Sequence, residues 1–586
     1  MRVKAVFAEE PKGTTSISQF FSESFRLSDF LEMREKFKSD FKNVICMQPK
    51  LRYELLIKKL LFFPLHAYPN KEIVYRDLHR YNYKEFYERL QRLASGLEVM
   101  GIRDAKIGFM EWNTHQYLEG MFAIPMMGSI LHTINIRLAP QEIVYTINYV
   151  KDDYIVVGRD FIPLAEKIAP HVPSVKGWIL TEEAETQLKP CYYYEDIIKS
   201  GSKYEFPDFD ENKTAVIYFT TGTTGLPKPV HFSHRNVVLQ AVINGLALSA
   251  HPSPVRVSST DVVMHIPPFF HGMGWTMPYL DTMLGMKQVL PGRYEPRVML
   301  ELIKREKVTF TCGVPIFLRM LIDSPESPQY IEYLRGLKFL LDGEHPPRAL
   351  IEKAKKMGVE VIEAYGMSEG VGFTFSVLKD HMLEWPWERQ VEFLNRAGLP
   401  GPFVEVKIVD EKGKEVPRDF KTMGEILIRS PGLTEGYWMD EKRTRESWTD
   451  DGWFRTGDIG VWDEEGYILV VDRAKDVIKS GGEWISSVRL EDLIMTHPAV
   501  NEVAVIAARS QKWSERPIAL VTLKPGARVS EEEIREFLMK NYVETGKIPK
   551  WWLPDKVFII EGMPRTSVGK IDKKVLRERY RDLELP

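Results

Sequence analysis

The stretch Phe219-Thr220-Thr221-Gly222-Thr223-Thr224-Gly225-Leu226-Pro227-Lys228 gathers hydroxyl side chains, glycines and one lysine directly after the apolar run 215–218. An apolar run of this kind predicts a buried strand. Glycines let the backbone turn tightly, and backbone N–H groups, hydroxyls and a lysine can together surround a phosphate. The spacing does not fit the Walker A pattern. A plain turn after a strand is the alternative, but the order of the residues favours a loop that holds a triphosphate.

Length and composition predict a globular protein with more than one domain. The chain has 586 residues, which exceeds the size at which single hydrophobic cores stop growing. Hydrophobic residues make up 44% and charged residues 27% of the sequence, as is usual in globular domains. The net charge of −3 is small, so we expect no nucleic-acid partner.

Three features indicate a cytoplasmic protein. Cys46, Cys191 and Cys312 lie far apart without metal-ligand spacing, which is typical of thiols in a reducing compartment. No apolar run approaches the about 18–20 residues that a membrane span needs. The N-terminus also lacks the apolar core of a signal peptide. We therefore expect no transmembrane segment, and peripheral membrane contact stays open.

Hydrophobic periodicity predicts the secondary structure of the first four hundred or so residues. Residues 1–60 are rich in Phe, Lys and Glu and are interpreted as a helical N-terminal extension. Apolar residues at three- and four-residue spacing predict a helix over 83–100, and the run 105–110 predicts a strand. The repeated alternation of strands and helices favours layered α/β structure with largely parallel sheets.

The pattern changes near residue 400. Short runs typical of strands follow at 404–409, 425–429 and 467–471, separated by turns, and predict a small β-subdomain. After residue 472 the chain is expected to form a small α+β unit. The predicted fold class is therefore α/β, with an N-terminal extension over 1–60, a large domain over 61–472 and a small C-terminal domain over 473–586.

Two further segments carry candidate chemistry. The aromatic segment 266–275 contains His271 and Trp275, and on its own it is typical of a buried aromatic turn. In the segment 363–369, a tyrosine ring can stack on a base, and Glu369 can bind Mg²⁺ beside phosphate oxygens. The alternative for that segment is a strand-to-helix turn with Ser368 and Glu369 as capping residues.

Three shorter patterns are ambiguous when taken singly. Asp458 follows Thr-Gly and is an ordinary turn former, although a carboxylate can also accept charge-assisted hydrogen bonds from two ribose hydroxyls. Asp472-Arg473-Ala474-Lys475 is typical of a solvated basic turn. Lys570 follows a glycine near the C-terminus, which by itself indicates little.

Taken together and in this order, the segments at 220–228, 365–369, 456–458, 472–486 and 564–570 resemble the motifs of the adenylate-forming superfamily. That superfamily contains acyl-CoA synthetases, luciferases and adenylation domains. The run 479–486 and the His271–Trp275 pair resemble medium- and long-chain fatty acyl-CoA synthetases in particular. The resemblance extends over about residues 65–580.

Three positions depart from the superfamily pattern. Pro229 stands where the superfamily usually has glycine after the loop lysine, and Ser368 replaces threonine. Only Gly343 matches in the segment 341–344, where Gly-Gly-Ala is usual. These departures concern the backbone just after Lys228 and the contacts to adenine.

The resemblance implies an ATP-dependent, AMP-forming ligase that joins fatty acids to CoA through an acyl-AMP, with ATP, Mg²⁺ and CoA as cofactors or co-substrates. It implies that Lys228, Glu369 and Lys570 are catalytic, that Thr220 and Glu369 bind Mg²⁺, and that His271 and Trp275 line a fatty-acid tunnel gated by Trp275. It also implies a mobile C-terminal domain with a hinge near Lys475. The nucleotide-binding residues that it implies are Thr220, Thr221, Gly222, Thr223, Thr224, Gly225, Gly343, Ala364, Tyr365, Gly366, Ser368, Asp458, Arg473, Lys475, Lys479 and Trp484.

Several alternatives stay open. The acid can be short, branched, hydroxylated or aromatic instead of a medium- to long-chain fatty acid. A carrier-protein adenylation domain is less favoured, because sixteen residues follow Lys570. A lipid-binding relative without activity is a different class, which the intact lysines and carboxylates oppose. By resemblance to long-chain enzymes, we expect a homodimer.

Overall fold

The computed structural model describes residues 53–220, 226–251, 255–481, 483–565 and 571–585. Residues 54–586 form one compact unit. Thr221, Gly222, Thr223, Thr224, Gly225 and Lys570 lie outside the described residues. No helix in the described part of the chain is both long enough and apolar enough to span a membrane.

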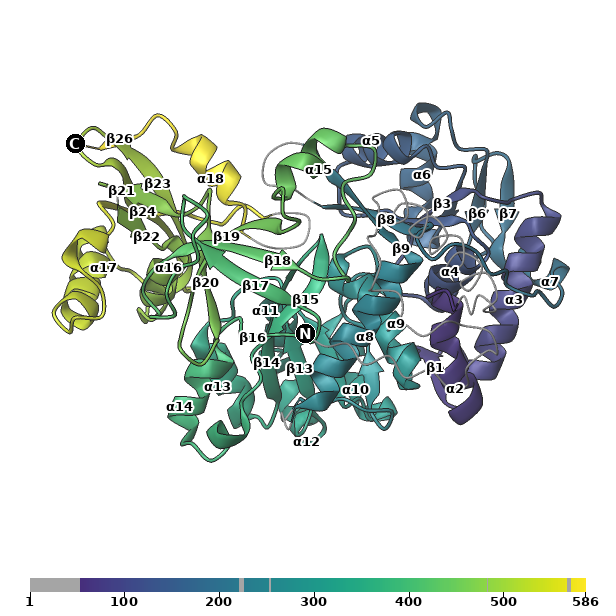
Figure 1. The fold of residues 1–586 in the computed structure, drawn as a ribbon, viewed down its shortest axis with the longest axis horizontal. Coiled ribbons are helices and arrows are strands. Elements are labelled where there is room, and N and C mark those ends of the chain that lie inside the picture. Colours follow the sequence, from purple (N-terminus) through teal and green to yellow (C-terminus); the bar gives the residue numbers. More distant parts are fainter. Residues whose placement is uncertain (1–52, 221–225, 252–254, 482, 566–570, 586) are drawn as a thin grey trace, which may run out of the picture. The chain divides into compact units, whose positions relative to one another are not determined.

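A seven-stranded sheet has the order β7-β6-β5-β3-β4-β8-β9. Its neighbouring strands are parallel except for β8 and β9, which form an antiparallel pair at one edge. The strands are β3 (Lys106–Met110), β4 (Ile130–Thr133), β5 (Tyr154–Val157), β6 (Gly177–Leu180), β7 (Cys191–Tyr193), β8 (Thr214–Thr220) and β9 (Lys228–Ser233). The helices before, between and after them are α3 (Tyr83–Val99), α4 (His115–Met126), α5 (Pro140–Val150), α6 (Ile162–Ile168), α7 (Tyr194–Ser200) and α8 (His234–Ala250) (Figure 1).

A nine-stranded sheet has the order β16-β15-β14-β13-β12-β10-β11-β1-β2. Its central strands are parallel, and antiparallel pairs close both ends. The strands are β1 (Glu72–Tyr75), β2 (His79–Asn82), β10 (Val262–Met264), β11 (Lys287–Leu290), β12 (Phe310–Gly313), β13 (Lys338–Leu341), β14 (Glu360–Met367), β15 (Gly370–Phe375) and β16 (Leu399–Pro400). The helices are α2 (Phe62–Ala67), α9 (Gly272–Leu284), α10 (Pro296–Glu306), α11 (Pro315–Ile322), α12 (Ile331–Leu334), α13 (Arg348–Lys356) and α14 (Trp387–Leu394).

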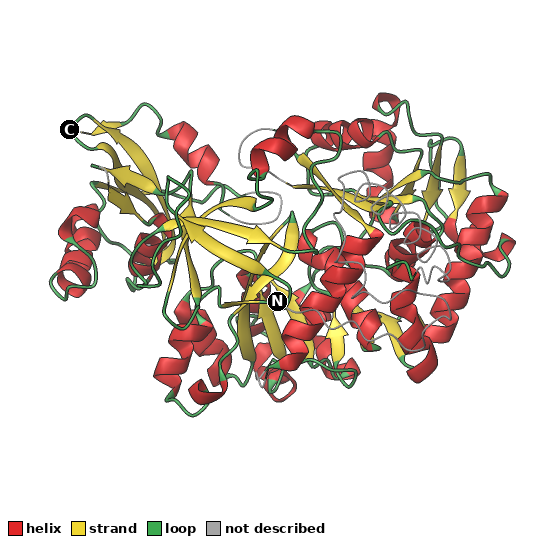
Figure 2. Cartoon of the chain, in the orientation of Figure 1, coloured by secondary structure: helices red, strands yellow, loops and turns green. Residues whose placement is uncertain are grey.

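Two smaller sheets follow in the sequence, and Figure 2 shows them as the strand-rich part of the chain. The first is antiparallel with the order β17-β18-β19-β20, and the second has the order β22-β21-β24-β23-β26 with β25 paired to β24. The strands are β17 (Glu405–Val409), β18 (Gly424–Arg429), β19 (Phe454–Trp462), β20 (Ile468–Arg473), β21 (Ile478–Ser480), β22 (Glu483–Ile485), β23 (Val500–Ser510), β24 (Ser514–Leu523), β25 (Lys556–Ile559) and β26 (Glu584–Leu585). The helices are α15 (Glu441–Ser447), α16 (Ser487–Met495), α17 (Glu531–Leu538) and α18 (Lys573–Arg579).

The helix α3 shows how local sequence sets an element. Asn82 and Glu85 form a capping box at its N-terminus, in which each side chain binds the backbone N–H of the other residue. The apolar residues at three- and four-residue spacing are buried on one face. The helix predicted over 83–100 and the strand predicted over 105–110 are therefore confirmed, as are the short strands predicted after residue 400.

The strand β8 has helices on both of its faces. Tyr218 packs against Trp275 of α9, whereas its neighbour Phe219 packs against Tyr145 and Tyr149 of α5. Successive strand residues point to opposite faces, so the alternation brings two helical layers onto one strand. The predicted α/β class is confirmed, and the loop after Thr220 leaves from a strand that is buried on both faces.

Candidate functional site

The loop that follows β8 connects two neighbouring antiparallel strands. Thr220 ends β8, Lys228 begins β9, and the two residues face each other in the register of the pair. Both side chains are half-buried. The ends of the candidate phosphate loop therefore lie side by side, which places one hydroxyl and one ammonium group at its base.

Pro229 is compatible with this hairpin. It lies on β9, the edge strand of the sheet, and edge strands are where a residue without a backbone N–H is tolerated. Its carbonyl accepts a 2.9 Å hydrogen bond from the Trp438 N–H. The departure from glycine thus costs no ladder hydrogen bond, and it keeps the carbonyl, which any residue would supply, that holds the segment 437–438 beside the loop.

Lys228 and Glu369 are brought together through a tyrosine. The Lys228 Nζ lies 6.0 Å from the centre of the Tyr437 ring, and the Tyr437 hydroxyl donates a 2.5 Å hydrogen bond to Glu369 Oε1. Burial and the Glu369 carboxylate raise the pKa of Tyr437 above its usual value. The tyrosine therefore stays neutral and orients a carboxylate that is itself only 6% exposed.

Ser368 and Glu369 form the tight turn of a β-hairpin. Met367 of β14 pairs directly with Gly370 of β15, so the alternative of a strand-to-helix turn is wrong. Gly366 lies where the two strands approach closely, because a Cβ there would come within 2.7 Å of the Gly372 nitrogen. Ala364 is buried on the same strand.

Tyr365, Asp458 and Arg473 form a second cluster. The Tyr365 hydroxyl donates a 2.7 Å hydrogen bond to Asp458 Oδ2, and Arg473 Nε lies 3.5 Å from Asp458 Oδ1. Asp458 and Arg473 face each other across β19 and β20. Burial raises the pKa of Asp458, and the Arg473 charge acts in the opposite direction.

Lys475 follows directly after β20. Burial, followed by repulsion from Arg473, lowers the pKa of Lys475 to about 8, and Arg577 and Lys228 add to this effect against the attraction of Asp476. The candidate hinge lysine therefore lies within the electrostatic reach of the loop lysine.

Lys479 and Trp484 face each other across the β21–β22 pair. The Lys479 Nζ lies 5.6 Å from the Trp484 ring and 3.7 Å from Glu411 Oε1. Gly343 follows β13 with φ of +82°, a conformation that glycine adopts without strain.

His271 and Trp275 lie at the start of α9. His271 is the N-cap residue, and its carbonyl accepts a 3.0 Å hydrogen bond from the Trp275 N–H. The Trp275 side chain is 1% exposed and packs against Phe232 and Tyr218, at ring-centre distances of 5.0 and 5.6 Å. The predicted buried aromatic turn is thus present as the first turn of a helix.

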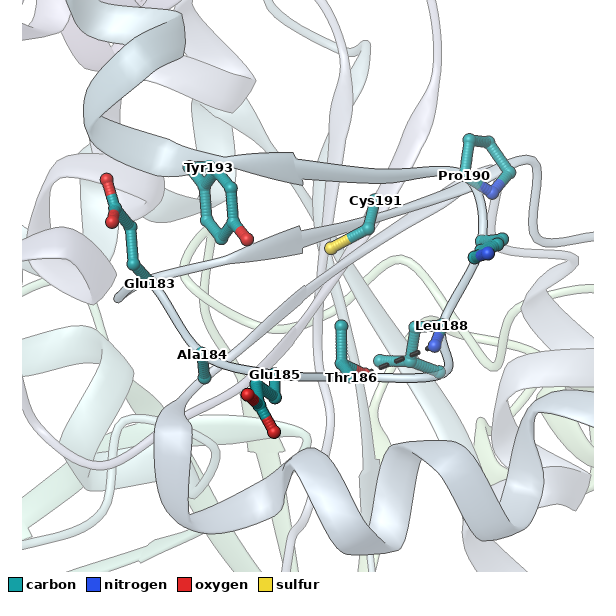
Figure 3. Close-up of a pocket in the computed structure, with 9 residues that line it drawn as sticks. Glu183, Ala184, Glu185, Thr186, Leu188, Pro190, Cys191 and Tyr193 are labelled. Carbon is teal, nitrogen blue, oxygen red and sulfur yellow. Dashed lines mark hydrogen bonds between the residues drawn. The ribbon is translucent and has the colours of Figure 1, made fainter.

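A broad hollow of about 960 Å³ lies away from these clusters. Figure 3 shows Glu183, Glu185 and Thr186 on the loop around it, with Cys191 and Tyr193 on the other side. None of the residues predicted from the sequence to be functional lines this hollow, so the candidate site is defined by the clusters above.

Tyr437 and Tyr218 contact candidate site residues, Glu369 and Trp275 respectively, and sequence reasoning singled out neither tyrosine. Tyr437 lies 68 positions from its partner Glu369, and Tyr218 is one of several apolar residues in a buried strand. No local spacing connects either tyrosine to the motifs. The available signal for Tyr218 was that an aromatic residue lies on β8, two residues before the end of that strand.

Comparison with known proteins decides the family. Residues 64–438 match the family described as AMP-binding enzyme. The chain belongs to the AMP-binding enzyme family. Residues 489–570 of this AMP-binding enzyme also match the family's C-terminal domain.

The relatives of this AMP-binding enzyme include acyl-CoA ligases. A long-chain-fatty-acid–CoA ligase from Thermus thermophilus is 40% identical, over 87% of this chain and 93% of that protein. A 3-methylmercaptopropionyl-CoA ligase from Ruegeria lacuscaerulensis is 34% identical, over 90% and 98%. The crystal structure of the anthranilate CoA ligase AuaEII with anthranoyl-AMP has the same fold, with a TM-score of 0.78 at 23% identity over 90% and 98% of the two chains. The resemblance to acyl-CoA synthetases is therefore confirmed.

Proposed function

We propose that this AMP-binding enzyme joins medium- to long-chain fatty acids to CoA in two steps, through an acyl-AMP. The observation that carries the proposal is the β14–β15 hairpin. It holds Tyr365, which binds Asp458, and four residues later Glu369, which binds Tyr437 beside Lys228. This hairpin is proposed to present Tyr365, with its partner Asp458, to the ribose end of a nucleotide. It is proposed to present Glu369 to the phosphates at the other end.

The chemistry begins from a poor acylating agent. A carboxylate oxygen attacks the α-phosphate of ATP, the bond to pyrophosphate breaks, and a mixed acyl-AMP anhydride forms. The CoA sulfur then attacks the acyl carbon and AMP leaves with the bridging oxygen. The acid is already ionised at neutral pH, so the first step needs no general base. Negative charge builds up on phosphate oxygens, and fixed donors near that charge are typically the largest catalytic contribution.

The residues of this chain divide that work. Lys228, the 220–225 loop and Lys570 are proposed to donate to the phosphates and to the acid, while Asp458 accepts from the ribose hydroxyls and the Tyr365 ring supports the base. Gly343, Ala364, Gly366 and Ser368 are proposed to shape the adenine and phosphate contacts. Asp458 is suited to its role because Tyr365 and Arg473 already fix its orientation.

The donor set fits Mg²⁺. Within the described ranges, no group of three or more His, Cys, Asp or Glu side chains is arranged to hold a metal ion. Mg²⁺, however, commonly takes one or two carboxylates together with substrate phosphates. Glu369, with Thr220 at the end of β8, supplies oxygen ligands of that kind. When bound, the ion would offset charge on the phosphates.

The small domain over 473–586 is proposed to move about Lys475. Lys570 is needed for the first step and must give way to CoA for the second, and Lys479 and Trp484 are proposed to face the site in turn. Closure of this kind keeps water from the reactive anhydride. The position of Lys475 supports this proposal. Lys475 lies two residues after the end of β20, and its ammonium group is close enough to that of Lys228 to be repelled by it.

The acid class rests on Trp275 and on the relatives. A buried indole at the start of α9 suits an apolar chain, and His271 precedes it. Because each buried CH₂ contributes about 0.8 kcal/mol, an apolar tunnel selects chain length gradually. Because one relative is a 3-methylmercaptopropionyl-CoA ligase, short acids are the second candidate substrates. Branched, hydroxylated and aromatic acids are further candidates.

A panel of acids tests the proposal. Straight-chain acids from C2 to C18 and a set of branched, hydroxylated and aryl acids are supplied with ATP and CoA, and AMP release is measured. We expect release that depends on CoA and is greatest for medium to long chains. Greatest release with a short or aryl acid would overturn the chain-length assignment, and the absence of release with every acid would overturn the ligase assignment.

We also propose that the enzyme is a cytoplasmic homodimer that contacts membranes at most peripherally. Light scattering on the full chain and on a truncation that lacks residues 1–60 tests the dimer. A monomer from the full chain would contradict it, and an unchanged dimer from the truncation would show that residues 1–60 are not needed for assembly.

A further inference from the structure

The Tyr218 hydroxyl is a buried polar group in an unusual position. Tyr218 is 1% exposed and lies on β8, two residues before the candidate phosphate loop. Its ring packs against Trp275 and stacks on Phe232, at centre distances of 5.6 and 6.0 Å. Its hydroxyl oxygen is buried and has no hydrogen-bond partner among the described residues.

An unpaired buried hydroxyl carries a cost in the free protein. Most buried polar groups in folded proteins are hydrogen-bonded, and a group left without a partner loses its hydration without compensation. Burial, followed by the Glu369 carboxylate, raises the pKa of Tyr218 well above its usual value, while the Ser368 hydroxyl and the Trp275 indole N–H, which lie near its oxygen as donors, act in the opposite direction. The hydroxyl therefore keeps its proton. The side chain therefore offers a donor that the fold itself does not use.

The space that this hydroxyl faces lies at the N-terminus of α9. A Cβ built on Gly272 would lie 3.6 Å from the Tyr218 oxygen, 3.4 Å from Val371 Cγ2 and 3.9 Å from the Ser368 Cα. These are ordinary contact distances, so the space is large enough for a methyl group and Gly272 leaves it unfilled. The first backbone N–H groups of a helix have no intrahelical partner and favour an anion.

This space lies between the two halves of the candidate site. On one side is Trp275, the proposed contact to the acyl chain, whose own indole N–H is buried without a partner in the described part of the chain. On the other side is the Ser368–Glu369 turn, the proposed contact to the phosphates. An acid lying along Trp275 would place its carboxylate here, where the bond to phosphorus forms.

We propose that Tyr218 binds the carboxylate of the acid, donating its hydroxyl hydrogen bond to one carboxylate oxygen while the N-terminus of α9 at Gly272 stabilises the charge. The other oxygen is then the one that attacks the α-phosphate. This inference rests on the proposed function, because it names the substrate group that this part of the same site receives.

Replacement of Tyr218 separates a binding role from a structural one. Tyr218→Phe removes an unpaired hydroxyl, so the melting temperature should stay equal or rise. Acid-dependent ATP–pyrophosphate exchange should show a KM for dodecanoate that is about ten- to hundredfold higher, as expected when a hydrogen bond to a charged group is lost. The KM for ATP should stay within about twofold of the original value.

Two further variants complete the test. Gly272→Ala fills the space beside the hydroxyl without a clash, and we expect it to fold and to raise the KM for dodecanoate as well. Tyr279→Phe is the matched control, because it also removes a buried tyrosine hydroxyl. Tyr279 lies on α9, the helix of Gly272, and its hydroxyl donates to the Met121 carbonyl at 2.7 Å. It should lower the melting temperature and leave the KM for dodecanoate unchanged.

The outcomes distinguish this inference from the proposed function. If the original enzyme exchanges pyrophosphate with no acid in the panel, the proposed function falls and this inference falls with it. If the original enzyme is active and Tyr218→Phe matches its KM for dodecanoate, the inference alone is overturned. A higher KM for ATP with an unchanged KM for dodecanoate would assign Tyr218 to the phosphates, and a lower melting temperature with unchanged kinetics would assign it a structural role. Both results contradict the proposal.

Discussion

At the scale of single residues, Asp458 shows how the fold prepares an acceptor. Its two carboxylate oxygens have different partners, the Tyr365 hydroxyl and the Arg473 guanidinium. The side chain is 5% exposed, so its orientation is set before any ligand arrives. A pre-oriented carboxylate loses little conformational freedom when it accepts hydrogen bonds from a ribose.

We predict that Asp458→Asn weakens ATP binding. The amide keeps the size of the side chain but loses the charge that strengthens its hydrogen bonds. The KM for ATP should rise about tenfold or more, since hydrogen bonds to charged groups contribute about 1.5–3 kcal/mol. Steady-state AMP release at varied ATP concentration measures this.

The control for this prediction is Asp463→Asn. Asp463 pairs with Arg396 and follows the same strand β19, but it belongs to none of the candidate clusters. We expect its KM for ATP to equal that of the original enzyme. Equal values for both variants would remove Asp458 from the nucleotide site.

Sequence motifs singled out the candidate residues that stand in short patterns, but they did not single out Tyr437. Thr220, Lys228, Glu369 and Asp458 stand in short patterns with unusual order. Tyr437 reaches Glu369 across 68 positions, and such non-local pairs depend on the fold rather than on neighbours in the sequence.

At the scale of elements, the β14–β15 hairpin is the organising feature of the site. The strand-to-helix alternative for the segment 363–369 was wrong, since the residues after Glu369 return as β15. Periodicity predicted α3 and β3 because their burial repeats locally. The pairing of β1 with β11 joins residues 72–75 to 287–290, and no local pattern indicates such a partner.

A histidine connects three elements near this hairpin. His345 follows β13, and its Nδ1 lies 3.3 Å from Glu363 Oε1 on β14, while its Nε2 lies 3.9 Å from Asp492 Oδ2 on α16. Although burial opposes the charge, Glu363 and then Asp492 raise the pKa of His345 to about 9, against repulsion from Arg489. The Asn395 amide nitrogen lies 2.8 Å from Nε2, and its amide oxygen has no hydrogen-bond partner within the described residues; turning the amide would let that oxygen accept from a protonated ring.

We predict that this cluster makes stability depend on pH. Because the pKa of His345 is higher in the folded state than its ordinary value of 6.5, its contribution is fully present below pH 6.5 and is lost as the pH rises through about 9. Urea unfolding of the original enzyme and of His345→Gln across this range measures it. The difference in unfolding free energy between them should shrink as the pH rises, and a constant difference would contradict the assignment.

At the scale of the whole molecule, the proposed reaction needs two arrangements of one site. The alternation of strands and helices predicted the α/β class, and the changes of pattern near residues 400 and 472 predicted the β-subdomain and the small C-terminal α+β unit. The hinge near Lys475 stays a prediction, because Lys570 lies outside the described residues and its approach to the site is inferred from resemblance.

We predict that Lys570→Ala separates the two half-reactions. Formation of acyl-AMP, measured by acid-dependent pyrophosphate exchange, should fall about 10²–10³-fold, the usual effect of removing one preorganised donor. Thioester formation from supplied acyl-AMP and CoA should keep most of its rate. Equal loss in both half-reactions would show that Lys570 is not specific to the first step.

The transfer of a carboxylate oxygen tests the central claim most directly. A fatty acid labelled with ¹⁸O in its carboxylate is incubated with the enzyme, ATP and CoA, and the nucleotide product is analysed by mass spectrometry. Reaction through an acyl-AMP leaves one labelled oxygen on AMP, because the bridging oxygen departs with the phosphate. Unlabelled AMP, or formation of ADP and phosphate in its place, would contradict the account.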